Sequence, residues 1–155
     1  MRFNVPITSK IMERRREMKR TVCLALVLFL CLSASAIAGE LVIVNSSVSV
    51  TALDPDALKN IYLGNKSQWS DGTRIIPVML ERGPAHESFI KNVVKKSLAQ
   101  FSSYWQQAIF TGKGQPPQSF ASEAELVSYV AKTKGAIGYI GPSTAHEGVK
   151  VIDQK

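Results

Sequence analysis

The chain has 155 residues, and its 19 Lys or Arg against 12 Asp or Glu side chains give a formal net charge of +7. Seven of the basic and two of the acidic residues lie within residues 1–38, so residues 39–155 carry 12 basic and 10 acidic side chains, a net charge of +2. A domain with so small a net charge has no electrostatic reason to bind a polyanion, which excludes a dedicated DNA- or RNA-binding protein. Both cysteines, Cys23 and Cys31, also lie in the first 38 residues, so disulfide and thiolate chemistry are excluded from the remainder.

Residues 1–38 have the three parts of a secretory signal peptide. A basic stretch ends at Arg20, an apolar run covers Thr21–Leu32, and small residues follow up to Ala38. The Ala36-Ile37-Ala38 sequence fits the A-x-A cleavage rule, so we expect cleavage after Ala38 and one domain over residues 39–155. The alternative is an uncleaved membrane anchor, but the apolar run is shorter than the roughly 20 residues that span a bilayer.

The first half of this domain predicts a strand, a helix and a second strand. An apolar run followed by alternating valines predicts a buried strand within Glu40–Val50. Asp54 and Pro55 are typical of the start of a helix, which Gly64 would end. The apolar segment 75–80 predicts the second strand, and Pro77 within it predicts a position near an edge or at a bulge.

The second half predicts three helices and two strands. Phe89, Val93, Val94 and Leu98 recur at helical spacing, and capping boxes at Ser97 and Ser122 predict two further helices. Residues 112–117, rich in Gly and Pro, predict a surface loop between them. The last two strands are expected at 136–140 and 149–152. Strands that alternate with helices indicate an α/β domain whose sheet is covered by helices.

Patterns typical of enzymes and metal sites are missing from the sequence. The only histidines, His86 and His146, lie 60 positions apart without carboxylates at ligand spacing, so we expect no metal. No Ser, His and acid are placed like a catalytic triad, and Gly112-Lys113-Gly114 lacks the G-K-[ST] of a phosphate loop. We therefore expect no catalytic residue, no cofactor and no enzymatic activity.

The loop from Glu81 to Ser88 is the candidate ligand site. It connects a predicted strand to a predicted helix, and the first turn of a helix offers unpaired backbone N–H groups that attract anions. Arg82 could form bidentate hydrogen bonds to an oxyanion, and His86 and Ser88 could donate as well. The alternative interpretation is that Arg82 is a solvated charge and His86 an ordinary first-turn residue.

Several motifs together resemble the phosphate-binding proteins of bacterial ABC importers. The order and spacing of these segments carry the resemblance: Leu58–Gly72 with its I-Y-L-G-x-x-x-x-W core, Ile76-Pro77-Val78, Tyr104-Trp105, Phe110–Gly114 and Gly135–Ile140 with the sequence G-A-I-G-Y-I. The chain is most similar to small secreted members that consist of about one lobe of the type II periplasmic-binding fold. The resemblance implies a mixed sheet flanked by helices, a bacterial periplasmic location and phosphate binding linked to transport.

The residues that hold phosphate in the full-length family are not matched here. On the alignment at Phe89, the family's Arg falls on Met79, and its Ser-Gly-Thr falls on Gly83, Pro84 and Ala85. An Arg common among the small members falls on His86, which is mostly neutral at pH 7. Pro84 also removes one backbone donor from the anion site.

Two hypotheses follow. The first is a binding module that holds phosphate or another small oxyanion weakly through Arg82, His86, Ser88 and nearby N–H groups, with Ser46 and Ser47 on the opposite wall, or with the site completed by a homodimer or a partner. The second is a ligand-free interaction module that docks on a membrane transporter, a sensor or an envelope assembly. In that case, the helix with Phe101, Tyr104 and Trp105 and the Pro116-Pro117 loop would supply contact area, unless those aromatic residues belong to the core.

Overall fold

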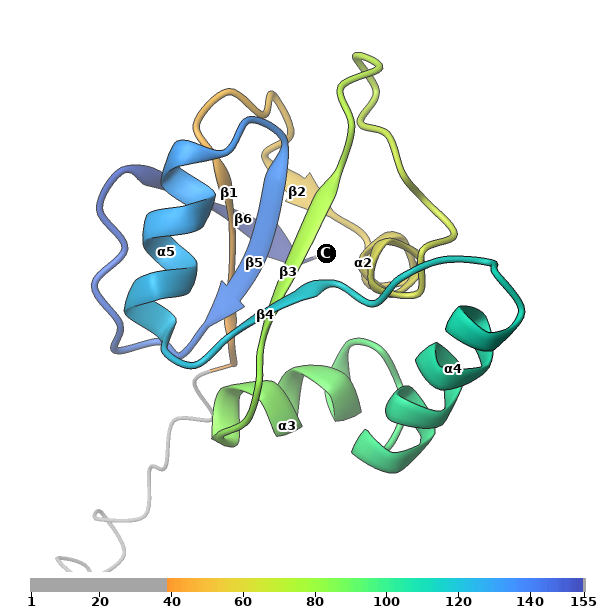
Figure 1. Ribbon diagram of the computed structural model, residues 1–155. Helices are drawn as coiled ribbons and strands as arrows, with labels where there is room; N and C mark the ends of the chain where they lie inside the picture. The colour runs from red at the N-terminus through yellow and green to blue at the C-terminus, as the bar shows by residue number, and fades with distance from the viewer. Residues whose placement is uncertain (1–38, 155) are drawn as a thin grey trace, which may run out of the picture. The chain divides into compact units, whose positions relative to one another are not determined.

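A computed structural model describes residues 39–154 of the chain, which form a six-stranded mixed sheet with helices on both faces (Figure 1). The predicted signal peptide lies outside the described residues. The strands are β1 (Leu41–Asn45), β2 (Ala52–Leu53), β3 (Ile76–Leu80), β4 (Gln118–Phe120), β5 (Ala136–Ile140) and β6 (Val149–Gln154). The helices are α2 (Pro55–Tyr62), α3 (Pro84–Asn92), α4 (Leu98–Phe110) and α5 (Glu123–Lys132).

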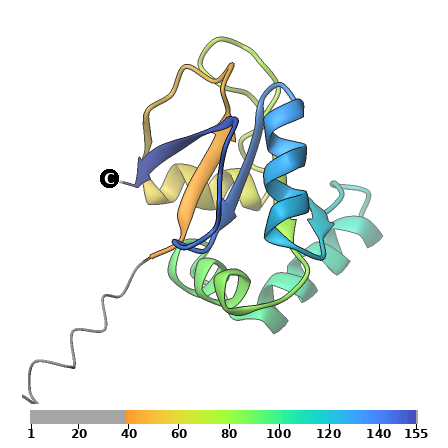
Figure 2. The ribbon, with the colours of Figure 1, turned by 90° about the vertical axis from the view of Figure 1, so that its left-hand side faces the viewer.

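The strand order is β2-β6-β1-β5-β3-β4. β1 is antiparallel to both of its neighbours, β5 and β6, whereas β3 is parallel to β5 and to β4. The carboxyl ends of β3 and β5 therefore lie at one end of the sheet, and the carboxyl end of β1 lies at the other. Figures 1 and 2 show α3 near the first of these ends. The sheet confirms the predicted α/β class.

Side-chain alternation along β5 separates the two faces of the sheet. Gly138 faces α5, where a Cβ atom would lie 2.6 Å from Leu126 Cδ2, so only glycine lets the helix pack this closely. The next residue, Tyr139, faces the other way and stacks on Phe89 of α3. The second glycine of the G-A-I-G-Y-I motif thus brings α5 onto one face, while the tyrosine anchors α3 on the other.

The helices begin where their capping residues predict. Asp54 accepts a hydrogen bond from the Asp56 N–H at 2.7 Å to start α2, and Pro55 occupies its first turn. Ser97 and Gln100 form the predicted capping box of α4. Ser122 caps α5 by accepting from the Glu125 N–H, which is one half of the box expected there.

The first strand is shorter than the sequence predicts, because a turn ends it at Asn45. The Asn45 side chain accepts from the Ser47 N–H at 3.0 Å, and the Val48 N–H donates to the Asn45 carbonyl at 2.9 Å. Such a side-chain-stabilised turn competes with strand continuation. Val48 still enters the core, but from the loop.

Two short strands, β2 and β4, were not predicted. β4 covers the exposed or half-exposed residues 118–120 and forms the sheet edge next to β3. β3 is therefore one strand in from the edge, which agrees with the position near an edge that Pro77 predicts. Pairing of β3 with β4 begins at Val78, one residue after Pro77. The N–H that Pro77 lacks would therefore have had no partner in the ladder with β4.

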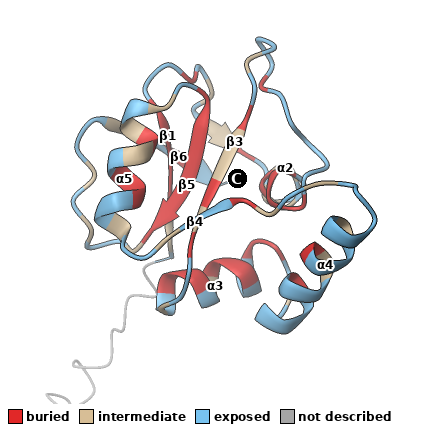
Figure 3. Ribbon diagram, viewed as in Figure 1, coloured by how far each residue is buried: buried red, intermediate tan, exposed pale blue. Residues whose placement is uncertain are grey.

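The buried core consists of the central strands and the inner faces of α2, α3 and α5, whereas α4 contributes only a narrow stripe. Figure 3 shows β1, β5 and the inner faces of α3 and α5 as buried, while most of α4 is exposed. Phe101 and Trp105 form the buried stripe of α4, and Tyr104 attaches the helix to the end of α2 by donating to the Leu63 carbonyl at 2.6 Å. α4 therefore packs at the periphery of the domain and contributes only two side chains, Phe101 and Trp105, to the core.

Candidate functional site

A pocket of about 420 Å³ lies between the β3–α3 loop and α4. It brings together two of the predicted site residues, Arg82 and His86. The pocket is lined by Met79, Glu81, Arg82, His86, Glu87, Leu98, Phe101, Ser102, Trp105, Gln106, Ile109 and Pro116. It lies at the carboxyl end of a parallel strand, which is the usual location of ligand sites in α/β sheets.

The start of α3 supplies backbone donors beside Arg82. Gly83 precedes the helix with φ 107° and makes no side-chain cap, and Pro84 fills the first turn without an N–H. The Glu87 N–H is the first to bond within the helix, donating to the Gly83 carbonyl at 3.0 Å. The N–H groups of Ala85 and His86 therefore have no partner within the helix and remain for a ligand or water.

His86 is buried, with 7% of its surface exposed, and it is fixed by a tyrosine from the sheet. Its Nδ1 lies 2.6 Å from the Tyr139 hydroxyl, which also accepts a hydrogen bond from the Leu80 N–H at 3.3 Å. Because the hydroxyl accepts from the Leu80 N–H, we assign its own proton to a hydrogen bond that it donates to Nδ1 of His86. This arrangement assigns the remaining ring proton to Nε2, on the part of the ring opposite Tyr139.

The surroundings of His86 favour its uncharged form. Burial is the main influence and lowers the pKa of His86, while Glu87 acts in the opposite direction. Burial also raises the pKa of Tyr139, so its hydroxyl stays protonated as a donor. A neutral imidazole with a proton on Nε2 can donate one hydrogen bond to a ligand oxygen without adding charge.

Tyr139 is a site residue that sequence reasoning missed. Its ring stacks on Phe89 with centroids 3.9 Å apart and planes 8° apart, and Tyr62 packs against both rings. Tyr62 is in turn tied to the sheet by donating to the Val78 carbonyl at 3.1 Å. The G-A-I-G-Y-I motif placed Tyr139 in a strand, but only the sheet register shows that it reaches His86.

Ser88 does not join Arg82 and His86 in the pocket. It lies two residues after His86 on α3, about 200° around the helix axis, and it is not among the lining residues. Its hydroxyl accepts a hydrogen bond from the Asn92 side chain at 2.9 Å, one turn further on. The structure therefore corrects the expectation that Ser88 lies beside the other donors.

Ser46 and Ser47 lie at the other end of the sheet. Val44, at the end of β1, pairs with Ile137 near the start of β5, whereas Arg82 and His86 follow the end of β3, which runs parallel to β5. The two serines are exposed in the turn after β1. The expectation that they form the opposite wall of the same site is wrong, because it overlooked the antiparallel direction of β1.

The opposite wall is formed instead by α4. Leu98, Phe101, Trp105 and Ile109 follow one another at three- and four-residue spacing and so share one face of the helix. Phe101 and Trp105 are buried, so these aromatic residues belong to the core and do not supply the contact area expected of an interaction surface. The exposed large apolar residues of α4 are Leu98, Ile109 and Phe110, at 41%, 47% and 93%.

Trp105 is buried at the junction of three pockets. Besides the pocket with Arg82, it lines one of about 490 Å³ with Gly64 and Lys113 and one of about 350 Å³ with Pro77 and Pro117. Its indole N–H has no hydrogen-bond partner among residues 39–154. Leaving such a donor unpaired costs about 1–3 kcal/mol, so the region around Trp105 is not optimised for stability alone.

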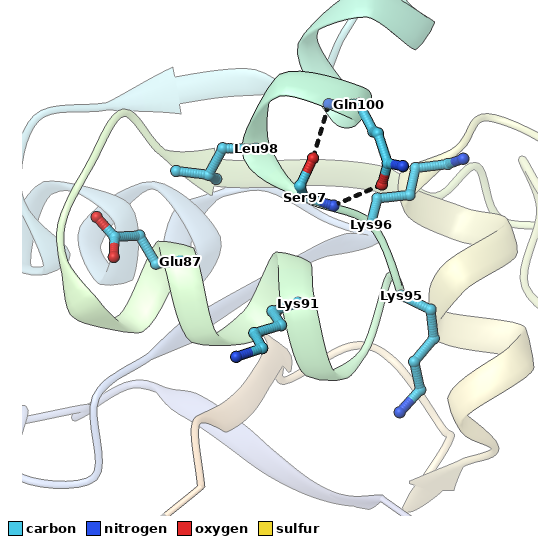
Figure 4. A pocket seen from close by; sticks show the side chains of 7 residues that line it. All are labelled: Glu87, Lys91, Lys95, Lys96, Ser97, Leu98 and Gln100. Atoms are coloured by element: carbon cyan, nitrogen blue, oxygen red, sulfur yellow. Dashed lines mark hydrogen bonds between the residues drawn. The ribbon is translucent and has the colours of Figure 1, made fainter.

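A basic pocket of about 550 Å³ lies where α3 ends and α4 begins (Figure 4). Lys91, Lys95 and Lys96 line it, but Figure 4 shows their ammonium groups pointing in different directions. Lys96 lies over the Tyr104 ring, 5.7 Å from its centroid. The capping box between Ser97 and Gln100 also occupies two of the donors at the start of α4. This pocket is a solvated basic surface rather than a converging anion site.

Within residues 39–154, no group of three or more His, Cys, Asp or Glu side chains is placed to hold a metal ion. The same part of the chain has no helix long and apolar enough to cross a membrane.

No family model and no curated protein matches the sequence. Solved structures do match. An ABC-type phosphate transport receptor from Vibrio cholerae is 19% identical, with a TM-score of 0.56 over 74% of this chain and 45% of the receptor. PstS from Borrelia burgdorferi is 17% identical, with a TM-score of 0.56 over 76% of this chain and 47% of PstS. A Clostridium perfringens protein solved with bound phosphate is 20% identical, with a TM-score of 0.57 over 74% and 44% of the two chains.

These likenesses confirm the fold that the motifs predict: a lobe of the periplasmic-binding kind, related in structure to phosphate ABC transporter substrate-binding proteins. The chain spans a little under half the length of each of these structures. The Vibrio cholerae protein is a phosphate transport receptor, and the Clostridium perfringens protein is described as a phosphate ABC transporter substrate-binding protein.

Proposed function

We propose that this domain is a ligand-binding module that holds a small oxyanion in the pocket between the β3–α3 loop and α4. One observation carries the proposal: Arg82 and His86, the cation and the neutral donor of the β3–α3 loop, line one pocket at the start of α3, a helix whose first N–H groups make no bond within the helix. Ser88, Ser46 and Ser47 are no part of this proposed site. The fold supports it further, since its structural relatives are substrate-binding proteins.

Each donor has a defined role in the proposed site. The exposed Arg82 guanidinium supplies the positive charge and two parallel hydrogen bonds. The N–H groups of Ala85 and His86 point along the axis of α3, whose N-terminal dipole favours an anion. His86 Nε2 adds a neutral donor. Pro84 leaves one donor fewer than a non-proline residue would, which is consistent with weak binding.

Phosphate is the first ligand to test, because one structural relative holds phosphate and another is a phosphate transport receptor. We further propose that the protein acts in the periplasm, where its predicted signal peptide would bring it, and delivers its ligand to a membrane transporter. Mass spectrometry of the secreted protein should find Gly39 at its N-terminus. A mature protein that retains residues 1–38 would contradict this location.

The binding proposal can be tested by isothermal titration of the purified protein with phosphate and sulfate. Arg82→Ala should weaken binding by about tenfold or more, since hydrogen bonds to charged groups contribute roughly 1.5–3 kcal/mol. Arg74→Ala is the matched control, because Arg74 is exposed and precedes β3 at its other end. Absence of binding for every anion, or equal losses in the two variants, would contradict the proposal.

A second candidate function is docking on another protein, and the exposure of Phe110 favours it. Phe110 is 93% exposed at the end of α4, next to the half-exposed Ile109, so two large apolar side chains are exposed side by side, as at many interaction sites. A homodimer or an envelope partner could cover them. Light scattering should then give a dimer mass for the wild type and a monomer mass for Phe110→Ser, or the wild type should bind a transporter that this variant does not.

A further inference from the structure

The pocket is larger and more apolar than an inorganic anion requires. Its volume of about 420 Å³ lies in the range of about 300–1,000 Å³ that is typical of sites for organic ligands. Leu98, Phe101 and Ile109 form the wall opposite Arg82, and Met79 and Pro116 also line it. An ion the size of phosphate would fill only the part next to the loop and leave the α4 wall in contact with water.

The wall residues include apolar side chains that the fold leaves exposed. Leu98 is 41% and Ile109 47% exposed, although both belong to a helix whose neighbouring positions 101 and 105 are buried. An apolar group lying along α4 would remove their surface from water, which is favourable in proportion to the area covered. The α4 wall therefore fits a ligand with an apolar body.

The charges around the pocket favour a ligand of low charge. Arg82 is its only cationic side chain if His86 is neutral, whereas Glu81 and Glu87 both contribute carboxylates. A dianion such as hydrogen phosphate would gain from one cation and be repelled by two anions. A single carboxylate placed between Arg82 and the start of α3 would be repelled less.

We propose that the ligand of this pocket is a monocarboxylate with an aromatic or aliphatic body, its carboxylate at Arg82 and the α3 N–H groups and its body along Leu98 and Ile109. This inference rests on the proposed function, because it uses the same anion donors. It goes further in naming the ligand class and in assigning the α4 wall a part in selecting it.

The test is an isothermal titration of the purified protein near neutral pH and at constant ionic strength with phenylacetate, acetate and phosphate. Phenylacetate should bind about tenfold or more tighter than acetate, because only its ring can cover the wall. It should also bind more tightly than phosphate.

Ile109→Ser should weaken phenylacetate binding several-fold, as expected for losing part of an apolar wall, and leave acetate binding unchanged. The matched control is Val151→Ser, since Val151 is a 39% exposed apolar residue on β6 and does not line the pocket. Glu87→Gln should improve phosphate binding more than acetate binding, because it removes a repulsive charge.

The results separate this inference from the proposed function. Phosphate binding that depends on Arg82, together with phenylacetate binding no tighter than acetate binding, would overturn the monocarboxylate assignment and leave the oxyanion site standing. Equal effects of Ile109→Ser and Val151→Ser would overturn the role of the α4 wall. If none of the three anions binds, both proposals fail.

Discussion

Two polar side chains, Asn45 and His86, are buried at opposite ends of the sheet, and they differ in how fully they are hydrogen-bonded. Asn45 is 6% exposed; its amide nitrogen donates to the carbonyls of Val130 and Ala131, and its oxygen accepts from the Ser47 N–H. His86 is 7% exposed, has Nδ1 bonded to the Tyr139 hydroxyl, and lines a pocket.

This difference separates a structural polar group from a functional candidate. Asn45 joins the turn after β1 to the end of α5, and its bonds are all made within the fold. His86 is bonded to Tyr139 through Nδ1 and lines the same pocket as Arg82, so its Nε2 proton is left for a ligand or water. Buried polar groups are costly unless bonded, so unused capacity at a rigid residue points to a ligand.

Asn45→Ala should produce the largest loss of stability. The substitution removes three hydrogen bonds and leaves the buried Val130 carbonyl without the amide, at a cost of about 3 kcal/mol in the free energy of unfolding. Urea denaturation measures this change. Anion binding, at the other end of the sheet, should be retained. Asn92→Ala, which removes one exposed side-chain bond, is the control and should change stability by less than about 0.5 kcal/mol.

His86→Asn should weaken binding more than it weakens the fold. The Asn oxygen can replace Nδ1 as the acceptor for Tyr139, so the free energy of unfolding should fall by only about 1 kcal/mol. The donor at Nε2 is lost, and anion affinity should drop about threefold to tenfold in a calorimetric titration. A large loss of stability with unchanged affinity would place His86 in the same structural class as Asn45.

Stability should decrease as the pH falls from about 7 to about 5, and His86 should contribute to this decrease. Burial lowers the pKa of His86 in the folded state, so the unfolded chain takes up a proton near pH 6.5 while folded His86 stays neutral to lower pH. The unfolded state then binds more protons in this window, and protonation favours unfolding. Urea denaturation at several pH values should show a shallower decrease for His86→Asn than for the wild type or for His146→Asn.

The smallest effect is expected at Ser46 and Ser47. Alanine at either position should change anion affinity by less than about twofold and stability by less than about 0.5 kcal/mol, because both residues are exposed and the bond to Asn45 uses the backbone N–H of Ser47. Titration and denaturation of the two variants test this expectation. A clear loss of binding would mean that the two ends of the sheet are coupled.

Most of the fold could be predicted because its signals are local. Caps at Asp54, Ser97 and Ser122 mark the helix starts, and apolar runs mark the strands that build the centre of the sheet. β4 was missed because its residues are exposed or half-exposed and its pairing with β3 is long-range. β1 was predicted too long because the turn after it depends on the Asn45 side chain, which a pattern of apolar residues does not reveal.

The site could be predicted only where it follows the chain. Arg82 and His86 are close in sequence, so the β3–α3 loop alone brings them together. Leu98 and Ile109 line the pocket because of the position of α4, and Tyr139 reaches His86 because of the sheet register; local patterns determine neither. The error at Ser46 and Ser47 has the same origin, since their distance from Arg82 depends on strand direction.

An NMR titration that follows backbone amides tests the central claim most directly. Phosphate and phenylacetate would be added to the ¹⁵N-labelled protein up to millimolar concentrations. The amide signals of Ala85 and His86 should shift with at least one of these anions, while that of Ser47 should stay in place. Unchanged signals at Ala85 and His86 with both anions would contradict an oxyanion site at the start of α3.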